Sequence, residues 1–462
     1  MALIKSISGI RGTIGGFAGD NLTPIDIVEC SAAFGFLILK NTKNPKIVIG
    51  RDARISGEMV SQLVAQTLRA VGCNVVDLGL STTPTVEIAV PEEKAGGGII
   101  ITASHNGRQW NALKFLNEKG EFISAEDGQT ILDLIASRKI EFASVEKLGS
   151  YSKNDAYIQK HIDKILNLPY VCADEVRAKN YKIVVDCINS TGAISVTPLL
   201  EQLGCQVILL NEVMNGDFAH NPEPLPEHLE KLSAKVLDTN AHLGISVDPD
   251  VDRLAFVCED GEMFGEEYTL VAVADYILRH KHGNTVSNLS STRALKDVTQ
   301  KLDGAYYASA VGEVNVVKKM KEVSAIIGGE GNGGIILPDL HYGRDALVGI
   351  ALFLSYLAKF DKPVSFLRRT YPQYFMSKNK IELNSGINLD LLFEKLQERY
   401  NKHNLNLEDG LKIDLEDGWI HLRKSNTEPI VRIYTEGTSK VASENLALKI
   451  KSDIGEIMKA HA

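Results

Sequence analysis

The chain has 462 residues, of which 44% are hydrophobic, and its formal net charge is −9. The length predicts about three domains, and the negative charge argues against a general affinity for nucleic acid or anionic membranes. No apolar run approaches the length of a membrane span, and the first residues do not resemble a secretory signal.

The six cysteines lack CxxC spacing, and Cys187 and Cys258 lie in strand-like runs. Both are therefore expected to be small core residues rather than disulfide partners. Together these features predict a cytoplasmic protein.

Strand–helix–strand units recur along the chain, which predicts three similar α/β domains. A polar helical stretch at 155–168 is expected to connect the first two domains. After Phe366, we expect the Arg-Arg-Thr-Tyr-Pro segment at 368–372 and the residues 376–380 to form a hinge into a smaller α+β domain. The expected units are 45–50, 58–71 and 74–80; then 181–187, 194–203 and 206–210; then 285–289, 294–302 and 305–309. The expected domain boundaries are 1–152, 153–258, 259–368 and 369–462.

In the first domain, an apolar run stops abruptly at polar residues. Residues 99–106 read Ile-Ile-Ile-Thr-Ala-Ser-His-Asn, and such a β-branched run is typical of a buried parallel strand. Because α/β folds carry their chemistry at the carboxyl ends of strands, Ser104 is expected at a functional edge. The alternative is a serine that serves only as a turn residue or helix cap.

Ser104 does not have the surroundings of a hydrolase nucleophile. The Gly-x-Ser-x-Gly elbow is absent, and in extended backbone His105 would point to the opposite face, away from Ser104. A serine without a base is suited to carrying a transferable phosphoryl group, which needs a cation and basic residues around it. The segment Arg51-Asp-Ala-Arg54 either assists this loop directly or orients it through an Arg–Asp pair.

The second domain contains Asp248-Pro-Asp-Val-Asp-Arg253 at the end of a short apolar strand. Alternate residues of a straight strand lie about 6.6 Å apart, so a bend, favoured by Pro249, is needed to bring the carboxylates together. Three carboxylates with open positions suit Mg²⁺ better than zinc. Arg253 occupies the glycine position of an EF-hand, and 254–258 reads as a strand, so that interpretation is excluded. A solvated acidic turn is the alternative.

The third domain carries Gly328-Gly-Glu-Gly-Asn-Gly-Gly334, which formally matches G-x-G-x-x-G. A strand-like run at 335–338 follows where a dinucleotide site requires a helix, so the nucleotide interpretation is rejected. The glycines allow close approach of a ligand, with Glu330 and Asn332 as acceptors for sugar hydroxyls. His341 and Asp345 are candidates to approach the sugar, although a helix cap is the plainer role for Asp345.

In the last domain, Arg423-Lys-Ser-Asn-Thr-Glu-Pro429 joins two strand-like runs at 419–422 and 430–434. Paired arginines bind phosphate in bidentate fashion, and neutral side chains add donors. An ordinary hairpin turn explains Ser-Asn-Thr but not the flanking arginines. The predicted phosphate-binding residues are Arg423, Ser425, Asn426, Thr427 and Arg432.

These four motifs, in this order, resemble the signature of the α-D-phosphohexomutase superfamily. The resemblance implies three similar α/β domains plus a smaller α+β C-terminal domain, with the active site in the central cleft. It also implies that Ser104 is phosphorylated and, with Asp248, Asp250 and Asp252, holds Mg²⁺. Lys114 would be the general acid/base, for which we expect a lowered pKa. The resemblance completes the catalytic set with Arg11, His105 and Arg253.

The implied reaction interconverts hexose 6-phosphate and hexose 1-phosphate through a hexose 1,6-bisphosphate, which also serves as activator. Gly-Ile-Arg-Gly near the start and Thr-Glu-Pro near the end are similar to the phosphoglucosamine mutase branch, which predicts glucosamine phosphate as substrate and a role in amino-sugar biosynthesis. Asn332, Asn426 and the lack of Pro after Asn106 depart from common patterns and leave glucose or mannose phosphate open.

Other classes are a metal-dependent phosphatase and a non-catalytic phosphosugar-binding protein. The expected partner is a small phosphosugar, with no nucleic acid or membrane; a homodimer is compatible with the sequence.

Overall fold

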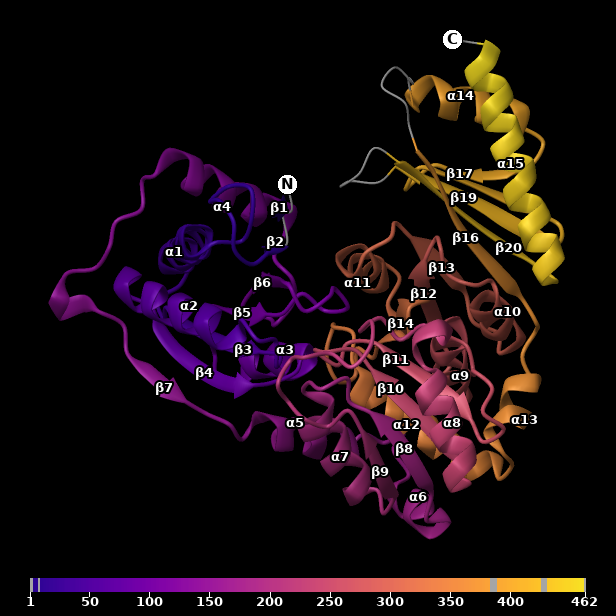
Figure 1. Cartoon of the computed structure of the whole chain (residues 1–462), viewed down its shortest axis with the longest axis horizontal. Coiled ribbons are helices and arrows are strands. Elements are labelled where there is room, and N and C mark those ends of the chain that lie inside the picture. Colours follow the sequence, from indigo (N-terminus) through magenta and orange to yellow (C-terminus); the bar gives the residue numbers. More distant parts are fainter. Residues whose placement is uncertain (1–2, 7–8, 383–388, 425–429, 461–462) are drawn as a thin grey trace. The chain divides into compact units, whose positions relative to one another are not determined.

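The computed structural model describes residues 3–6, 9–382, 389–424 and 430–460. The chain forms two compact units, and Figure 1 labels the helices and strands. The first comprises Met1–Thr269 and Asn332–Leu367, and the second comprises Leu270–Gly331 and Arg368–Ala462. No helix among the described residues is long and apolar enough to cross a membrane.

The first unit begins with a seven-stranded mixed sheet of order β1-β2-β6-β5-β3-β4-β7. Strand β3 pairs in parallel with both β4 and β5, and β5 pairs antiparallel with β6. The parallel strands β3 and β5 therefore end at the same edge of the sheet. The strands are β1 (Leu3–Ser6), β2 (Gly9–Thr13), β3 (Lys46–Arg51), β4 (Asn74–Leu80), β5 (Gly97–Ile101), β6 (Trp110–Leu116) and β7 (Tyr151–Lys153).

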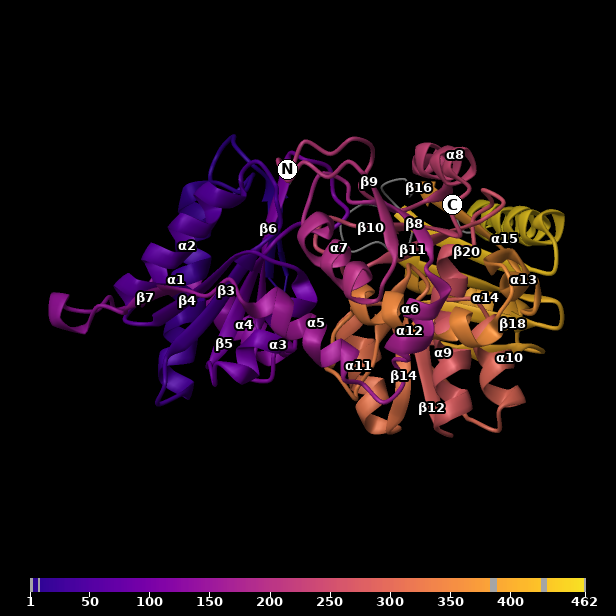
Figure 2. The ribbon, with the colours of Figure 1, turned by 90° about the horizontal axis from the view of Figure 1, so that it is seen from below.

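Helices cover both faces of this sheet (Figures 1 and 2) because its central strands are apolar on both sides. In β3, Ile47 and Ile49 pack with residues of α1, α2 and α4, whereas Val48 packs with residues of α3 and α5. Such continuous β-branched runs are typical of buried strands. The helices are α1 (Pro24–Asn41), α2 (Gly57–Val71), α3 (Thr83–Glu92), α4 (Ala125–Ser137) and α5 (Tyr157–Leu166); a single 3₁₀ turn spans Val145–Lys147.

A second sheet in the same unit has the order β11-β10-β8-β9. Strands β8, β9 and β10 are parallel, and β11 returns antiparallel to β10 after the aspartate motif. The strands of this sheet are β8 (Lys182–Asp186), β9 (Gln206–Leu210), β10 (Leu243–Val247) and β11 (Leu254–Cys258). The same part of the chain also contains β15 (Gly334–Ile336), which is not in this sheet, and the helices α6 (Ala173–Lys179), α7 (Gly192–Gln202), α8 (Glu230–Thr239), α12 (Ala346–Phe360) and α13 (Val364–Arg369), with a 3₁₀ turn at Pro226–His228.

The second unit contains parallel strands in the order β13-β12-β14, packed with α10 and α11. Strand β14 ends at Glu330, and the glycine-rich segment leads into a strand rather than a helix, which confirms that this is not a dinucleotide fingerprint. The elements are α9 (Glu266–His280), β12 (Asn284–Asn288), α10 (Ala294–Lys301), β13 (Tyr306–Ser309), α11 (Glu313–Glu322) and β14 (Ala325–Glu330).

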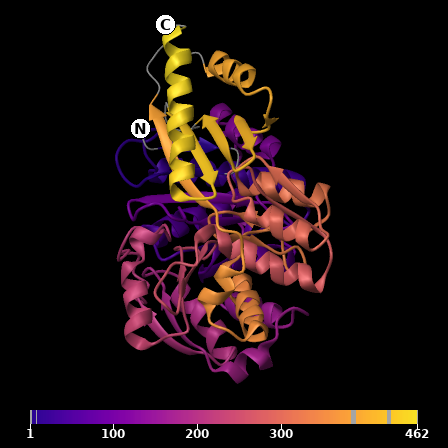
Figure 3. The same cartoon turned by 90° about the vertical axis from the view of Figure 1, so that its right-hand side faces the viewer.

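The C-terminal part of this unit is an antiparallel sheet of order β16-β20-β19-β18-β17. Helix α15 lies against it, mainly over β16 and β20 (Figure 3). The elements are β16 (Phe375–Glu382), α14 (Leu389–Arg399), β17 (Asn404–Asn406), β18 (Leu411–Leu415), β19 (Gly418–Lys424), β20 (Ile430–Gly437) and α15 (Lys440–Ala460).

The expected hinge is wrong for 376–380, although 370–374, between α13 and β16, has neither helix nor strand. Residues 376–380 form the middle of β16, which pairs with β20 in continuous register from Phe375↔Gly437 to Glu382↔Ile430. The strand is an edge strand with an exposed face, so its polar residues do not signal a break in structure. The expected strand–helix–strand units, by contrast, are all present within a few residues, and the mixed α/β fold class is confirmed.

Candidate active site

Ser104 lies in the loop that follows the fully buried strand β5. Its backbone has φ = +47°, a left-handed conformation that is rare for a residue with a side chain. The Ser104 amide donates to Thr102 Oγ1 at 2.9 Å, which supports this turn. Ser104 is only 3% exposed, so its hydroxyl is enclosed by other protein atoms.

The expectation that His105 points away from Ser104 is wrong, because it assumed extended backbone. The left-handed turn brings His105 Nδ1 to 3.3 Å from Ser104 Oγ. Burial and the nearby cations Arg253, Arg11 and Arg344 lower the pKa of His105 to about 2. The imidazole is therefore neutral near pH 7.

The Ser104 loop is held by a buried Arg–Asp pair, one of the two roles that the sequence left open for Arg51–Arg54. Arg54 Nε donates to Asp52 Oδ2 at 3.0 Å, and both side chains are 0% exposed. The Arg54 guanidinium also donates to four backbone carbonyls of the loop, those of Ser104, Asn106, Gly107 and Trp110. A single cation thus fixes the whole turn.

The three motif aspartates converge, as the predicted bend requires. Asp248, Asp250 and Asp252 are all 0% exposed, and one oxygen from each lies within 4.8 Å of the others. Val251 has φ = +61°, which is strained for a β-branched residue and marks the tight turn. Ser104 Oγ donates to Asp248 Oδ2 at 2.7 Å, so the serine hydroxyl joins the same cluster.

Cations and a hydroxyl surround the other two aspartates. Asp250 Oδ2 accepts from Lys114 Nζ at 2.9 Å and from Thr83 Oγ1 at 2.6 Å. Asp252 Oδ2 accepts from Arg344 Nη2 at 2.6 Å and lies 3.7 Å from Lys114 Nζ.

The lowered pKa expected for Lys114 is wrong for this arrangement. Burial acts to lower the pKa, but the carboxylates of Asp250 and Asp252 outweigh it and raise the pKa above its usual value. Lys114 is therefore protonated at neutral pH.

The aspartate cluster fits a divalent cation. Asp250 Oδ1 and Asp252 Oδ1 are buried and accept no hydrogen bond, a costly condition that a metal ligand relieves. Burial and the charges of Asp252 and Asp250 raise the pKa of Asp248 well above its usual range. Crowded like charges of this kind are stabilised by a cation, and an all-oxygen donor set suits a hard ion.

Two further arginines belong to this region. Arg11 Nη1, on β2, donates to Asn106 Oδ1 at 3.0 Å. Arg253 Nη1 donates to Glu223 Oε1 at 3.0 Å, while Arg253 Nε is buried without a hydrogen-bond partner. A cavity of about 610 Å³ lies beside these groups and is large enough for a sugar phosphate. Its lining residues are His105, Asn106, Gly107, Arg108, Gln109, Phe218, His220, Asn221, Pro222 and Glu223.

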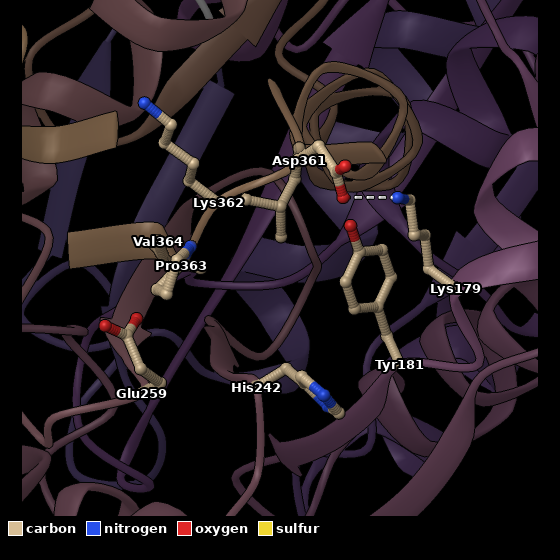
Figure 4. A pocket seen from close by; sticks show the side chains of 9 residues that line it. Lys179, Tyr181, His242, Glu259, Asp361, Lys362, Pro363 and Val364 are labelled. Atoms are coloured by element: carbon tan, nitrogen blue, oxygen red, sulfur yellow. Dashed lines mark hydrogen bonds and ion pairs between the residues drawn. The ribbon is translucent and has the colours of Figure 1, made fainter. Parts of the chain in front are cut away.

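A smaller pocket of about 300 Å³ in the same unit lies around Tyr181 and His242 (Figure 4). Three of its charged groups already have partners: Lys179 pairs with Asp361, and Glu259 accepts from the amide of Ser365 at 3.0 Å. Neither of the two groups of metal-ligating side chains found among the described residues lines it, so it is not assigned to the reaction.

In the second unit, Glu330 is 5% exposed and accepts from Asn288 Nδ2 at 2.9 Å and from the Gly312 amide at 3.0 Å. Asn332, at the start of a segment of the first unit, accepts from the Gly334 amide through Oδ1. In the C-terminal sheet, Arg423 and Arg432 are direct cross-strand partners, and Arg423 Nε lies 2.6 Å from Asp409 Oδ2. Ser425, Asn426 and Thr427 lie outside the described residues.

His341 and Asp345, the two candidates to approach the sugar, contact each other. Asp345 caps α12 by accepting from the amides of Leu347 and Val348, which confirms the capping role. Two residues that contact the aspartate cluster, Thr83 and Arg344, and one that contacts Arg253, Glu223, were missed. Arg344 could have been found, because it directly precedes the predicted helix cap Asp345. Thr83 could not, because it looks like any threonine at the start of a helix.

The chain matches the models of all four phosphoglucomutase/phosphomannomutase domains: α/β/α domain I over residues 3–141, domain II over 159–261, domain III over 265–374 and the C-terminal domain over 387–452. It is 33% identical to a phosphoglucomutase/phosphomannomutase of Thermococcus kodakarensis, with 95% of this chain and 97% of that protein covered. It is 30% identical to a phosphoglucosamine/phosphogalactosamine mutase of Sulfurisphaera tokodaii, with 98% and 99% covered.

Among solved structures, a phosphoglucomutase/phosphomannomutase family protein of Burkholderia thailandensis superimposes with a TM-score of 0.84 at 26% identity, covering 99% of this chain and 97% of that chain. The serine beside three carboxylates, the four matched domains and full-length similarity at 30% identity or more lead to one conclusion. This chain is a phosphohexomutase, an isomerase of the phosphoglucomutase/phosphomannomutase family.

Proposed function

We propose that this phosphohexomutase interconverts glucosamine 6-phosphate and glucosamine 1-phosphate, with Ser104 as the residue that carries the phosphoryl group. The role of Ser104 is supported by the hydrogen bond from Ser104 Oγ to Asp248 Oδ2, because this bond fixes the hydroxyl within the carboxylate cluster. The relationship to a phosphoglucosamine/phosphogalactosamine mutase and the Gly-Ile-Arg-Gly segment support glucosamine phosphate as the substrate.

Phosphorylation of Ser104 removes the proton that it donates to Asp248. The phosphate oxygens would then face three buried carboxylates, and this arrangement requires positive charge between them. We assign that charge to Mg²⁺ held by Asp248, Asp250, Asp252 and the phosphoserine. When bound, Mg²⁺ neutralises charge on the transferring phosphoryl group.

The side chains around the serine have distinct tasks in this scheme. Arg54 and Asp52 hold the turn so that Ser104 Oγ keeps its direction. Lys114, protonated at neutral pH, gives its proton to the serine oxygen as that oxygen leaves, and the neutral amine that results takes the proton of the attacking sugar hydroxyl. Arg11 and Arg253 neutralise phosphate charge. The Arg253 Nε–H group is buried and has no hydrogen-bond partner, so it can donate to a phosphate oxygen.

His105, with a neutral ring 3.3 Å from Ser104 Oγ, orients that oxygen by hydrogen bonding rather than by charge. The bisphosphorylated sugar must present each of its two phosphates to Ser104 in turn. We therefore propose a separate set of groups for the phosphate that is not reacting, namely Arg423, Arg432, Ser425, Asn426 and Thr427. Glu330 and Asn332 bind the sugar hydroxyls.

The substrate is tested by measuring kcat/KM for the 6-phosphates or 1-phosphates of glucosamine, glucose and mannose, with Mg²⁺ and a hexose 1,6-bisphosphate. A preference of about 100-fold for glucosamine phosphate, or about 2.7 kcal/mol, is the expected result. Equal or better use of glucose or mannose phosphate would contradict the amino-sugar assignment. The second candidate, a phosphoglucomutase/phosphomannomutase, is favoured by the name of the Thermococcus relative.

Mg²⁺ dependence and phosphate release complete the test. We expect activity to be lost with EDTA and restored by Mg²⁺, and little free phosphate to appear during turnover. Stoichiometric release of phosphate without isomerisation would instead support a phosphatase.

A further inference from the structure

Five side chains, four of them buried, form a continuous network away from Ser104, and the reaction scheme uses none of them. His161 Nε2, in α5, lies 2.9 Å from Asp345 Oδ2, and His341 Nε2 lies 3.3 Å from the same oxygen. His341 Nδ1 lies 3.3 Å from Glu87 Oε2, in α3. The second nitrogen of His161 lies 3.0 Å from Thr85 Oγ1, also in α3. The network therefore joins α5, α3 and the segment that begins α12.

Both ends of this network continue to the metal-binding aspartates. Arg344, the residue before Asp345, donates to Asp252 Oδ2 at 2.6 Å. Thr83, in the same helix turn as Thr85, donates to Asp250 Oδ2 at 2.6 Å through its hydroxyl, and its amide donates to the Asp250 carbonyl at 2.9 Å. The side chains that hydrogen bond to two of the three aspartates thus lie one or two positions along the chain from a member of the network.

Because the network is largely buried, the positions of its side chains depend on one another. The side chains of His161 and Asp345 are 0% exposed, and that of Glu87 is 1% exposed. Asp345 Oδ1 is committed to the N-terminal amides of α12, so only its Oδ2 is available to the histidines. Because a buried polar group without its partner is costly, loss of one member must move its neighbours.

We propose that His161 is a positioning residue for the metal site. Through Asp345 it fixes the start of α12 and holds Arg344 against Asp252, and through Thr85 it fixes the start of α3 and holds Thr83 against Asp250. This inference rests on the proposed Mg²⁺ site and adds a residue that touches none of its ligands. Residues that lie outside the metal ligands orient those ligands, and replacing such a residue typically lowers metal affinity by about 10- to 100-fold.

The two imidazoles and the carboxylate are also a donor set that zinc accepts. The hydrogen-bonded arrangement is favoured because three of the four ring nitrogens already have an oxygen partner within hydrogen-bond distance, and the fourth, His341 Nδ1, lies 3.3 Å from the carboxylate of Glu87. In addition, although burial acts to lower it, Asp345 and Glu87 raise the pKa of His341 to about 10, so both ring nitrogens carry protons and neither offers a lone pair to a metal.

The test compares His161→Gln with Tyr157→Phe in the full-length protein. Tyr157 is a matched control on the same helix, 2% exposed, and its hydroxyl donates to Glu93 Oε1 at 2.8 Å, outside the network. We would measure Mg²⁺ binding by calorimetry with Mg²⁺ alone, kcat/KM at saturating Mg²⁺, and the melting temperature. For His161→Gln we expect about 10-fold weaker Mg²⁺ binding or more; for Tyr157→Phe we expect lower stability with unchanged Mg²⁺ affinity.

A His161→Gln protein that is less stable but binds Mg²⁺ as the wild type does would overturn the proposal. If that variant does not fold, Glu87→Gln serves instead: weakened Mg²⁺ binding supports the proposal, and unchanged binding overturns it. Stoichiometric zinc in the purified wild-type protein would also overturn it, in favour of a second metal site. A wild-type protein that binds no Mg²⁺ would instead contradict the proposed metal site itself.

Discussion

Ser104 and Asp248 are joined by a buried hydrogen bond in which the hydroxyl donates to Oδ2 at 2.7 Å. The other oxygen of Asp248 accepts from the amides of Asp252 and Arg253, each at 3.0 Å, so the carboxylate cannot rotate away. Two loops from different sheets are thereby locked to one another through a single pair. The serine is placed where a cation bound to the aspartates would also contact a phosphate on its oxygen.

Replacing Asp250 by Asn is expected to remove the Mg²⁺ response. Asn has nearly the same volume as Asp, but it lacks the negative charge that pairs with Lys114. It also has one carboxylate oxygen fewer, and Asp250 Oδ1 is one of the buried oxygens that accept no hydrogen bond. We expect the apparent Mg²⁺ affinity to fall by more than about 10-fold, because a change in a residue that only hydrogen bonds to a metal ligand already lowers metal affinity by about that much. Asp260→Asn, an exposed aspartate after β11, is the control. An unchanged Mg²⁺ titration for Asp250→Asn would remove this residue from the site.

Lys114→Met is expected to lower kcat by about 10²- to 10⁴-fold, the usual range for a general acid/base. Since the group is protonated near neutrality and paired with Asp250, the loss falls on the chemical step rather than on binding. KM should change much less than kcat. Lys119→Met, an exposed lysine in the turn after β6, should leave both constants unaltered. A Lys114→Met enzyme altered only in KM would argue against proton transfer by this residue.

Arg54→Lys tests the clamp on the Ser104 loop. Lysine keeps the charge but cannot reach four carbonyls and a carboxylate together, so at least one buried acceptor loses its donor. We expect the free energy of unfolding to fall by about 2 kcal/mol or more and kcat to fall with it. Arg51→Lys, a half-buried neighbour with one bond to the Asp52 carbonyl, is the comparison. Equal effects of the two changes would mean that the clamp is unimportant.

Stability should depend on pH through His341. Its pKa is raised from 6.5 to about 10 because Asp345 and Glu87 outweigh burial, with His161 also facing Asp345. A raised pKa adds stability that is complete below about pH 6.5 and disappears as the pH rises through about 10. We expect the difference in unfolding free energy between wild type and His341→Gln to shrink over this range, by at most about 1.4 kcal/mol per pH unit.

Denaturant titrations at pH 7, 8, 9 and 10 would measure this difference. A difference that stays constant over the whole range would show that His341 is not charged in the folded protein.

The elements that the sequence predicted well are those with an unambiguous local pattern. The β-branched runs of β3 and β5 and the polar residues after them indicated both the sheet and the position of Ser104. The strand pattern of 376–380 was misread because an edge strand with one exposed face alternates like an irregular segment. The left-handed φ of Ser104, which brings His105 beside it, has no sequence signal at a non-glycine residue.

Contacts between distant segments could not be predicted from the sequence. Thr83 and Asp250 are 167 positions apart, and His161 and Asp345 are 184 apart, yet each pair is hydrogen bonded. Neither Thr83 nor His161 lies in a recognisable motif, because its role depends on which helices pack together. The pKa of Lys114 depends in the same way on two carboxylates that only the folded structure brings near it.

The most direct test of the account is transfer of labelled phosphate from a hexose 1,6-bisphosphate to the enzyme, with the modified residue located by peptide mass spectrometry. We expect one phosphate per chain at Ser104, none in Ser104→Ala, and a fall in turnover of that variant on the order of 10⁴-fold or more. Ser81→Ala, a buried serine whose hydroxyl has no hydrogen-bond partner, should retain both label and activity. Label on another residue, or normal turnover by Ser104→Ala, would contradict the central claim.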